Sequence, residues 1–140
     1  MENISTFISQ NLIFCLSFVL LLAIYVIFEL IQTKQSKTNL SVQGAVSEVN
    51  KHKGVYIDTR SKEEFEKSHI IGAINIATGD IVNSLKKLSK YKSKPIVLYS
   101  QANSCDKTAA ILRKDGFESI YSLNGGFKAW IAANYPTKNL

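Results

Sequence analysis

The sequence has few cysteines, prolines and methionines: among 140 residues there are two Cys, two Pro and one Met. Two cysteines cannot build the disulfide framework of a small secreted domain, and their spacing is not that of a zinc site. With only seven glycines and 46% hydrophobic residues, the chain is neither collagen-like nor disordered. Its length allows one ordinary domain and little else.

Basic residues are missing before Lys34, and only Glu2 and Glu29 carry charge in that part of the chain. The sequence from Leu12 to Phe28 is uncharged and apolar, and extended to Gln32 it makes a helix of about 31 Å, which matches a bilayer core. A cleaved signal peptide is a competing interpretation, but no basic segment precedes the stretch and no small-x-small site follows it. A buried core helix would be shorter and would carry a polar stripe. We therefore predict a short tail over residues 1–10 and a transmembrane helix over 11–32.

All 17 basic residues follow the apolar stretch, against nine acidic ones, so the part after residue 32 carries a net charge of about +8. Lys34 and Lys37 come directly after the stretch, and the positive side of a membrane helix stays in the cytoplasm. We expect a polar linker over 33–39 and a soluble domain over 40–137 in a reducing compartment. Cys105 would be a free thiol there.

From Leu40 onward, apolar runs of strand length alternate with segments of helical period, which predicts an α/β fold with a parallel sheet covered on both faces. Ser41 and Ser61 are expected to cap helices. Strands are predicted as a very short one near residue 40, then at 55–58, 73–76, 95–99 and 119–123. Helices are predicted at 42–50, 62–67, 80–88, 104–115 and within 125–134.

Two sequence motifs carry a resemblance to a known family. VYIDTRSKEEFEKSHIIGAINI (Val55–Ile76) and LNGGFKAW (Leu123–Trp130) are similar to strings of the rhodanese-like domains, and the resemblance extends from about Leu40 to Pro136. It implies a five-stranded parallel sheet flanked by helices and, for an active member, sulfurtransferase activity. A membrane-anchored bacterial branch of this family, with one helix in front, is similar in architecture. The resemblance thus places the chain in the bacterial inner membrane as a single-pass protein.

The family usually has a nucleophilic Cys at the end of the fourth strand and an Arg five residues later. Aligned on Ala109 and Ala110, the sequence has Ser100 at the Cys position and Cys105 at the Arg position. A serine cannot store a sulfur atom as a persulfide. Without the Arg, the site lacks the guanidinium that the related phosphatase chemistry needs to hold a phosphoryl group, so a phosphatase is not expected.

Cys105 is the remaining candidate nucleophile, and the membrane-anchored branch also has a loop Cys at this late position. If the next helix begins near Ser104, the thiol lies in its first turn, where the helix dipole lowers a thiol pKa. Lys107 would assist and Asp106 would oppose this effect. The alternative is a partly buried small residue in an inactive domain. The candidate site loop consists of Ser100, Gln101, Ala102, Asn103, Ser104 and Asp106 around Cys105.

Two functions follow from these alternatives. In the first, Cys105 accepts sulfane sulfur as a persulfide and passes it on, with donor and acceptor proteins or small thiols as partners. In the second, the loop keeps its shape without its chemistry, and the domain is a protein-interaction module at the inner membrane face. No cofactor and no metal is expected in either case.

Other conspicuous residues are expected to be structural. Asp58 and Arg60 could be an acid and an anion binder, but at a strand end they more simply pair with each other or with neighbouring loops. His69 is interpreted as a hydrogen-bonded structural imidazole and Trp130 as a core aromatic. Backbone geometry explains Gly125 and Gly126, since no G-x-G-x-x-G string follows the first strand.

A run of lysines surrounds the end of the predicted 80–88 helix. A solvated helix end explains it, and each Lys could also add about 1 kcal/mol of attraction to an anionic leaflet. Sedimentation of the domain without residues 1–35 with anionic vesicles tests that idea. Nucleic-acid binding has no motif to support it. The run consists of Lys86, Lys87, Lys90, Lys92 and Lys94.

Overall fold

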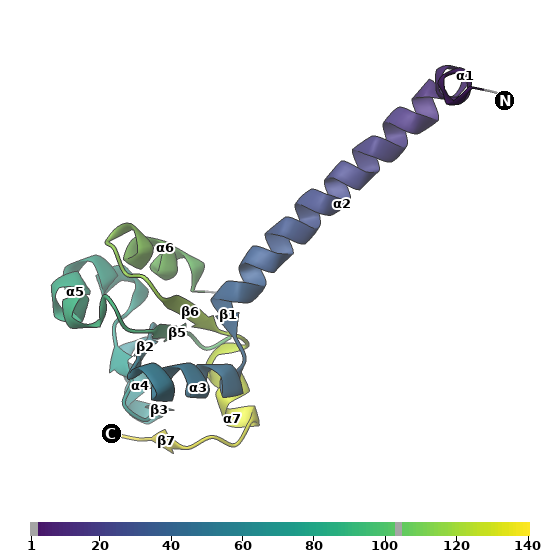
Figure 1. Cartoon of the computed structure of the whole chain (residues 1–140). Helices are drawn as coiled ribbons and strands as arrows, with labels where there is room; N and C mark the ends of the chain where they lie inside the picture. Colours follow the sequence, from purple (N-terminus) through teal and green to yellow (C-terminus); the bar gives the residue numbers. More distant parts are fainter. Residues whose placement is uncertain (1–2, 103–104) are drawn as a thin grey trace. The chain divides into compact units, whose positions relative to one another are not determined.

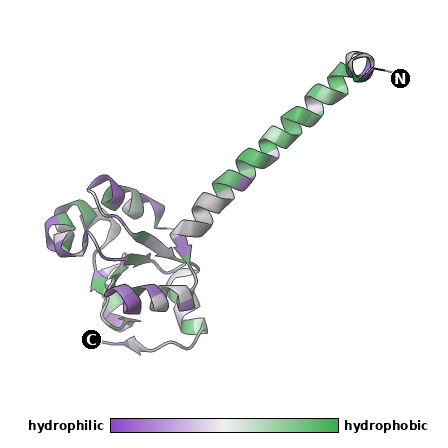
Figure 2. Cartoon of the chain, in the orientation of Figure 1, coloured by the Kyte–Doolittle hydropathy of each residue, from purple (hydrophilic) through white to green (hydrophobic). Residues whose placement is uncertain are grey.

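The computed structural model describes residues 3–102 and 105–140, with side chains left out for 32–37. It divides into two compact units, residues 1–37 and 38–140. The first unit contains α1 (Ile4–Gln10) and most of α2 (Leu12–Thr38) (Figure 1). Within α2, Leu12–Ile31 is long and apolar enough to cross a membrane, with a mean hydropathy of 2.7 and none of it buried (Figure 2).

The first unit differs from the prediction at both ends of the apolar stretch. Residues expected to form an N-terminal tail contain α1, and α2 continues to Thr38, so the predicted linker over 33–39 is helical for most of its length. The reason is local, since neither Gly nor Pro interrupts the sequence between Gln32 and Thr38. A polar composition alone does not end a helix.

The second unit is built on a five-stranded parallel sheet, as predicted. Its order is β1-β6-β5-β2-β4. The central strand β5 is buried along its whole length, which fits its apolar sequence IVLY. The predicted strand at 73–76 is shorter, and only Ile74 and Asn75 pair with β2. The strands are β1 (Asn39–Leu40), β2 (Val55–Asp58), β4 (Ile74–Asn75), β5 (Ile96–Tyr99) and β6 (Ile120–Leu123).

Alternate residues of the sheet feed two hydrophobic cores. On one face, Ile57 and Leu98 pack with α5 (Ile81–Leu88) and α6 (Asp106–Lys114). On the other, Tyr56 and Val97 pack with α3 (Val42–His52) and α7 (Gly126–Ala132). The period of two along each strand separates these sets. Helices therefore cover both faces of the sheet, as the sequence predicts.

Helix α4 (Lys62–Lys67) and several short elements also belong to the domain. Ser61 forms a capping box with Glu64 at the start of α4, and Ser41 accepts a hydrogen bond from Gly44 N at the start of α3, as predicted for both serines. The short elements include the 3₁₀ turns η1 (Thr78–Asp80) and η2 (Ser89–Tyr91) and the strand β3 (His69–Ile70).

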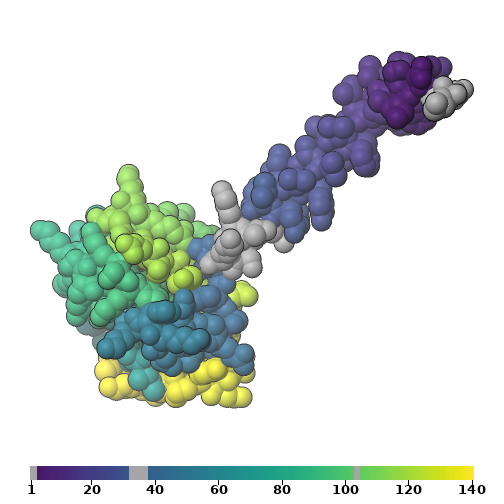
Figure 3. Space-filling view, viewed as in Figure 1, coloured from purple at the N-terminus to yellow at the C-terminus, as the bar shows by residue number. Residues whose placement is uncertain are grey.

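The end of the chain forms a pairing that the sequence did not reveal. β7 (Thr137–Lys138) runs antiparallel to β3, with His69 opposite Lys138 and Ile70 opposite Thr137. Figure 3 shows the C-terminal residues, in yellow, along the lower side of the domain. β3 and β7 have two residues each, too few to show a periodic pattern, and the sequence therefore did not predict that they pair.

Candidate functional site

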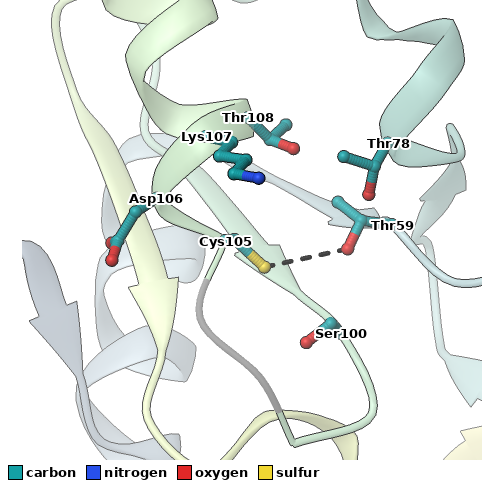
Figure 4. A pocket seen from close by; sticks show the side chains of 7 residues that line it. All are labelled: Thr59, Thr78, Ser100, Cys105, Asp106, Lys107 and Thr108. Atoms are coloured by element: carbon teal, nitrogen blue, oxygen red, sulfur yellow. Dashed lines mark hydrogen bonds between the residues drawn. The ribbon is translucent and has the colours of Figure 1, made fainter.

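A cavity of about 420 Å³ opens beyond the carboxyl end of β5, beside the start of α6 (Figure 4). This is the usual place for a ligand crevice in an open α/β sheet. Four of its seven lining residues carry a hydroxyl group, and its charged side chains are one lysine and one aspartate. The lining residues are Thr59, Thr78, Ser100, Cys105, Asp106, Lys107 and Thr108.

Cys105 is the sulfur-bearing residue of this cavity, but its place in the helix differs from the prediction. α6 begins at Asp106, so Cys105 is the N-cap residue and does not lie in the first turn. The residue is buried, with 6% of its surface exposed. Its Sγ nevertheless lines the cavity and faces the hydroxyl of Thr59 at 3.7 Å (Figure 4).

The electrostatics of Cys105 also differ from the prediction. Burial raises the pKa of its thiol. Hydrogen bonds with Thr59 and Ser100 lower the pKa, but the negative charges of Asp106 and Asp58 raise it further, and the net shift is upward. The predicted lowering of the pKa was wrong: Cys105 lies outside α6 as its N-cap, and burial gives a net rise. At neutral pH the resting state of Cys105 is therefore the protonated thiol.

The other residues of the predicted loop fall into three groups. Ser100 and Asp106 line the cavity with Cys105, although Asp106 points away from the sulfur (Figure 4). Gln101 and Ala102 are exposed, and the Gln101 side chain accepts a hydrogen bond from Arg60 at 3.3 Å. The remaining two predicted members, Asn103 and Ser104, lie outside the described residues.

Sequence reasoning missed the threonines of the cavity. Thr59 directly follows β2, which pairs with β5 in parallel, so both strand ends reach the same edge of the sheet. That adjacency was a usable signal, because residues after neighbouring parallel strands converge at that edge. Thr78 comes from η1 and Thr108 from α6, and only the folded structure brings these two to the cavity.

The start of α7 holds the loop after β5 in place. Phe127 N donates to Ser100 O at 2.8 Å, and Lys128 N donates to Gln101 O at 3.2 Å. Gly126 has φ of +60°, and a Cβ there would lie 2.5 Å from Ser100 O. The neighbouring Gly125 has φ of +75°. Both glycines thus meet backbone requirements that other residues could satisfy only with strain.

Asp58 and Arg60 form a buried ion pair beneath the same loop. Arg60 Nη2 lies 2.6 Å from Asp58 Oδ2, and the two side chains are 5% and 0% exposed. The guanidinium also donates to Ser68 O at 2.7 Å and lies 4.0 Å from the centre of the Phe127 ring. Burial lowers the pKa of Arg60, but the hydrogen bonds and charge of Asp58 outweigh this effect and raise it. The guanidinium is therefore occupied within the protein and does not line the cavity.

His69 and Trp130 have internal partners. His69 Nδ1 donates to Phe65 O at 2.8 Å, and its ring stacks on Phe65 with centroids 3.8 Å apart. Trp130 is buried and donates from Nε1 to Pro136 O at 3.1 Å. These contacts connect the β3 and C-terminal segments to the core.

The lysine run lies on α5, η2 and the residues that follow. Lys86, Lys87 and Lys90 are exposed, whereas Lys92 pairs with Asp115 at 3.4 Å. The attraction of this lysine run to an anionic leaflet stays a prediction.

Within residues 3–102 and 105–140, no three His, Cys, Asp or Glu side chains gather in a way that could hold a metal ion.

Comparison with known proteins agrees with this fold. The Rhodanese-like domain model matches residues 41–133, and the chain belongs to this sulfurtransferase-related family. YibN of Escherichia coli strain K12 is 29% identical over 139 residues, covering 97% of this chain and 96% of YibN. The thiosulfate sulfurtransferase GlpE of Pseudomonas savastanoi pv. phaseolicola is 31% identical over 86 residues, covering 61% of this chain and 79% of GlpE. The crystal structure of BH2092 from Bacillus halodurans has a TM-score of 0.66 at 25% identity, covering 77% of this chain and 81% of that one.

Proposed function

We propose that Cys105 carries sulfane sulfur as a persulfide. The observation that supports this most is the position of its Sγ, in a hydroxyl-lined cavity at the carboxyl end of the central strand. Cys105 is also the one cysteine in the sequence of the domain. The family membership and the relative named thiosulfate sulfurtransferase support sulfur chemistry at this site.

The transfer has two displacement steps. Cys105 first loses its proton to solvent, and the thiolate attacks the outer sulfur of a donor such as thiosulfate. The sulfur–sulfur bond of the donor breaks, its electron pair leaves with sulfite, and a persulfide remains on Cys105. The thiolate of a small thiol or a partner protein then attacks the outer sulfur, and Cys105 leaves as a thiolate. No external oxidant or reductant is needed.

Sulfur uptake by the full-length protein tests this proposal. After incubation with thiosulfate or a small persulfide, the intact protein should gain the mass of one sulfur atom. Cys105→Ser should abolish the gain, because a hydroxyl cannot form a persulfide. Cys15→Ser is the matched control and should retain it. If the wild-type protein gains no sulfur from either type of donor, the proposal is wrong.

We also propose that α2 anchors the domain to the bacterial inner membrane with the domain in the cytoplasm. The apolar stretch Leu12–Ile31 supports a single membrane crossing, and the position of Lys34 and Lys37 after it supports the orientation. Protease added to spheroplasts should leave the domain intact, and the same protease should digest it after lysis. Digestion in intact spheroplasts would contradict the orientation.

The burial of Cys105 favours a second candidate function. A thiol that is 6% exposed and has a raised pKa is poorly suited to rapid reaction with a donor, and an inactive interaction module would tolerate it. In that case a Cys105→Ser protein would still restore whatever a deletion strain loses. A sulfur carrier requires the opposite result.

A further inference from the structure

The hydroxyl of Thr59 lies between two groups that can accept its hydrogen. Thr59 Oγ1 is 3.0 Å from Tyr99 O, to which it donates, and 3.7 Å from Cys105 Sγ. A threonine hydroxyl has one hydrogen, and a carbonyl can only accept. When the hydroxyl donates to Tyr99 O, the S–H of Cys105 is therefore the donor to Thr59 Oγ1.

This arrangement has to change when Cys105 ionises. A thiolate can only accept hydrogen bonds, and rotation of the Thr59 hydroxyl would direct its hydrogen to Sγ. Tyr99 O would keep a partner, because it also accepts a hydrogen bond from Thr59 N at 2.9 Å. The exchange thus leaves no buried acceptor without a donor, and the bond gained is to a charged atom, which makes it stronger than the bond lost.

The surroundings fix Thr59 in the position that this exchange requires. Thr59 is buried, and on either side of it Asp58 and Arg60 form their ion pair. Because Asp58 binds the Arg60 guanidinium, Arg60 does not line the cavity, and hydroxyl groups face the sulfur. The Ser100 hydroxyl is a second hydrogen-bond partner of the thiol.

We propose that Thr59 is a catalytic hydrogen-bond switch, which donates to Tyr99 O while Cys105 is a thiol and to Cys105 Sγ when it is a thiolate. This inference rests on the proposed function, because the thiolate forms before attack on a donor and again when the sulfur leaves. The thiol proton goes to solvent, and Thr59 neither gains nor loses a proton. Thr59 stabilises the Cys105 thiolate before it attacks the donor and again when the sulfur leaves.

The test measures the ionisation of Cys105 in full-length protein that carries Cys15→Ser, so that Cys105 is the one thiol that can be alkylated. Because the pKa of Cys105 is raised, the rate of alkylation by iodoacetamide should continue to rise with pH above the ordinary cysteine pKa of about 8.5. Thr59→Val removes the hydroxyl and should shift this profile upward, with alkylation at neutral pH about tenfold slower. Thr59→Ser keeps the hydroxyl and should stay within about twofold of the parent.

Thr59→Ala also removes the hydroxyl, with a side chain smaller than that of Val. Circular dichroism identifies the variants that fold. An unchanged or lowered Cys105 pKa in either folded variant would overturn the switch. A purely structural Thr59 would predict that outcome, since looser packing exposes the thiol and speeds alkylation. The pKa readout is independent of sulfur uptake. Failure of the parent protein to take up sulfur would refute the proposed function, whereas failure of the shift would refute the switch.

Discussion

Asp58→Asn is expected to destabilise the rhodanese-like domain by about 3–5 kcal/mol. The substitution keeps the size of the side chain but removes the negative charge that Arg60 contacts at 2.6 Å. The Arg60 side chain is 5% exposed, and its other hydrogen-bond partners, Ser68 O and the Gln101 side chain, are neutral. An uncompensated guanidinium would then remain buried, and this makes the loss of one partner costly. Urea unfolding of the purified protein, followed by circular dichroism, measures the effect.

The exposed pair Lys62–Glu66 provides the control for this prediction. Its side chains are 82% and 49% exposed and their charges lie 3.8 Å apart, so Glu66→Gln should change the stability by less than about 0.5 kcal/mol. Equal, small effects of Asp58→Asn and Glu66→Gln would show that the buried pair does not organise this part of the domain.

Gly126→Ala is expected to destabilise the domain and to disturb the loop before Cys105. The residue has φ of +60°, which costs a residue with a Cβ about 1–3 kcal/mol. The added Cβ would also lie 2.5 Å from Ser100 O and 3.0 Å from Gln101 O, and both are backbone atoms. We therefore expect the loop to move, with a lower thermal midpoint and reduced sulfur uptake.

Gly79→Ala is the matched control for the glycine prediction. Apart from the residues next to it in the chain, nothing lies within 4 Å of a Cβ built at Gly79, and its φ is not in the left-handed region. Its thermal midpoint should stay close to that of the wild-type protein. A Gly126→Ala protein with wild-type stability and wild-type sulfur uptake would show that the close approach of α7 does not position the loop.

The fold was predictable where local sequence and packing agree. IVLY in β5 is apolar on both faces, and Ser41 and Ser61 are followed by helical periodicity, so these elements formed as expected. The pairing of β3 with β7 was not predictable, because two residues contain no pattern. The extension of α2 to Thr38 was not predicted, because a polar composition suggests a linker even where, as here, no helix-breaking residue is present.

The candidate site was predictable in location but not in electrostatics. The resemblance to rhodanese-like domains, aligned on Ala109 and Ala110, located the loop, and the structure places Ser100 and Cys105 at one cavity. The pKa of Cys105 depends on how deeply packing buries its sulfur and on Asp58, which is far away in the sequence. Thr59 was overlooked although its place directly after β2, which pairs with β5, was a usable signal, whereas its contact with Cys105 spans 46 positions of the chain. Tertiary contacts of this kind have no local sequence signal.

The most direct test of sulfur transfer through Cys105 is to locate the added sulfur atom. Full-length protein is incubated with thiosulfate, unreacted thiols and persulfides are alkylated, and proteolytic fragments are analysed by tandem mass spectrometry. We predict one extra sulfur atom on the fragment that contains Cys105 and none on the fragment that contains Cys15. An unmodified Cys105 fragment, or extra sulfur on Cys15 alone, would contradict this account.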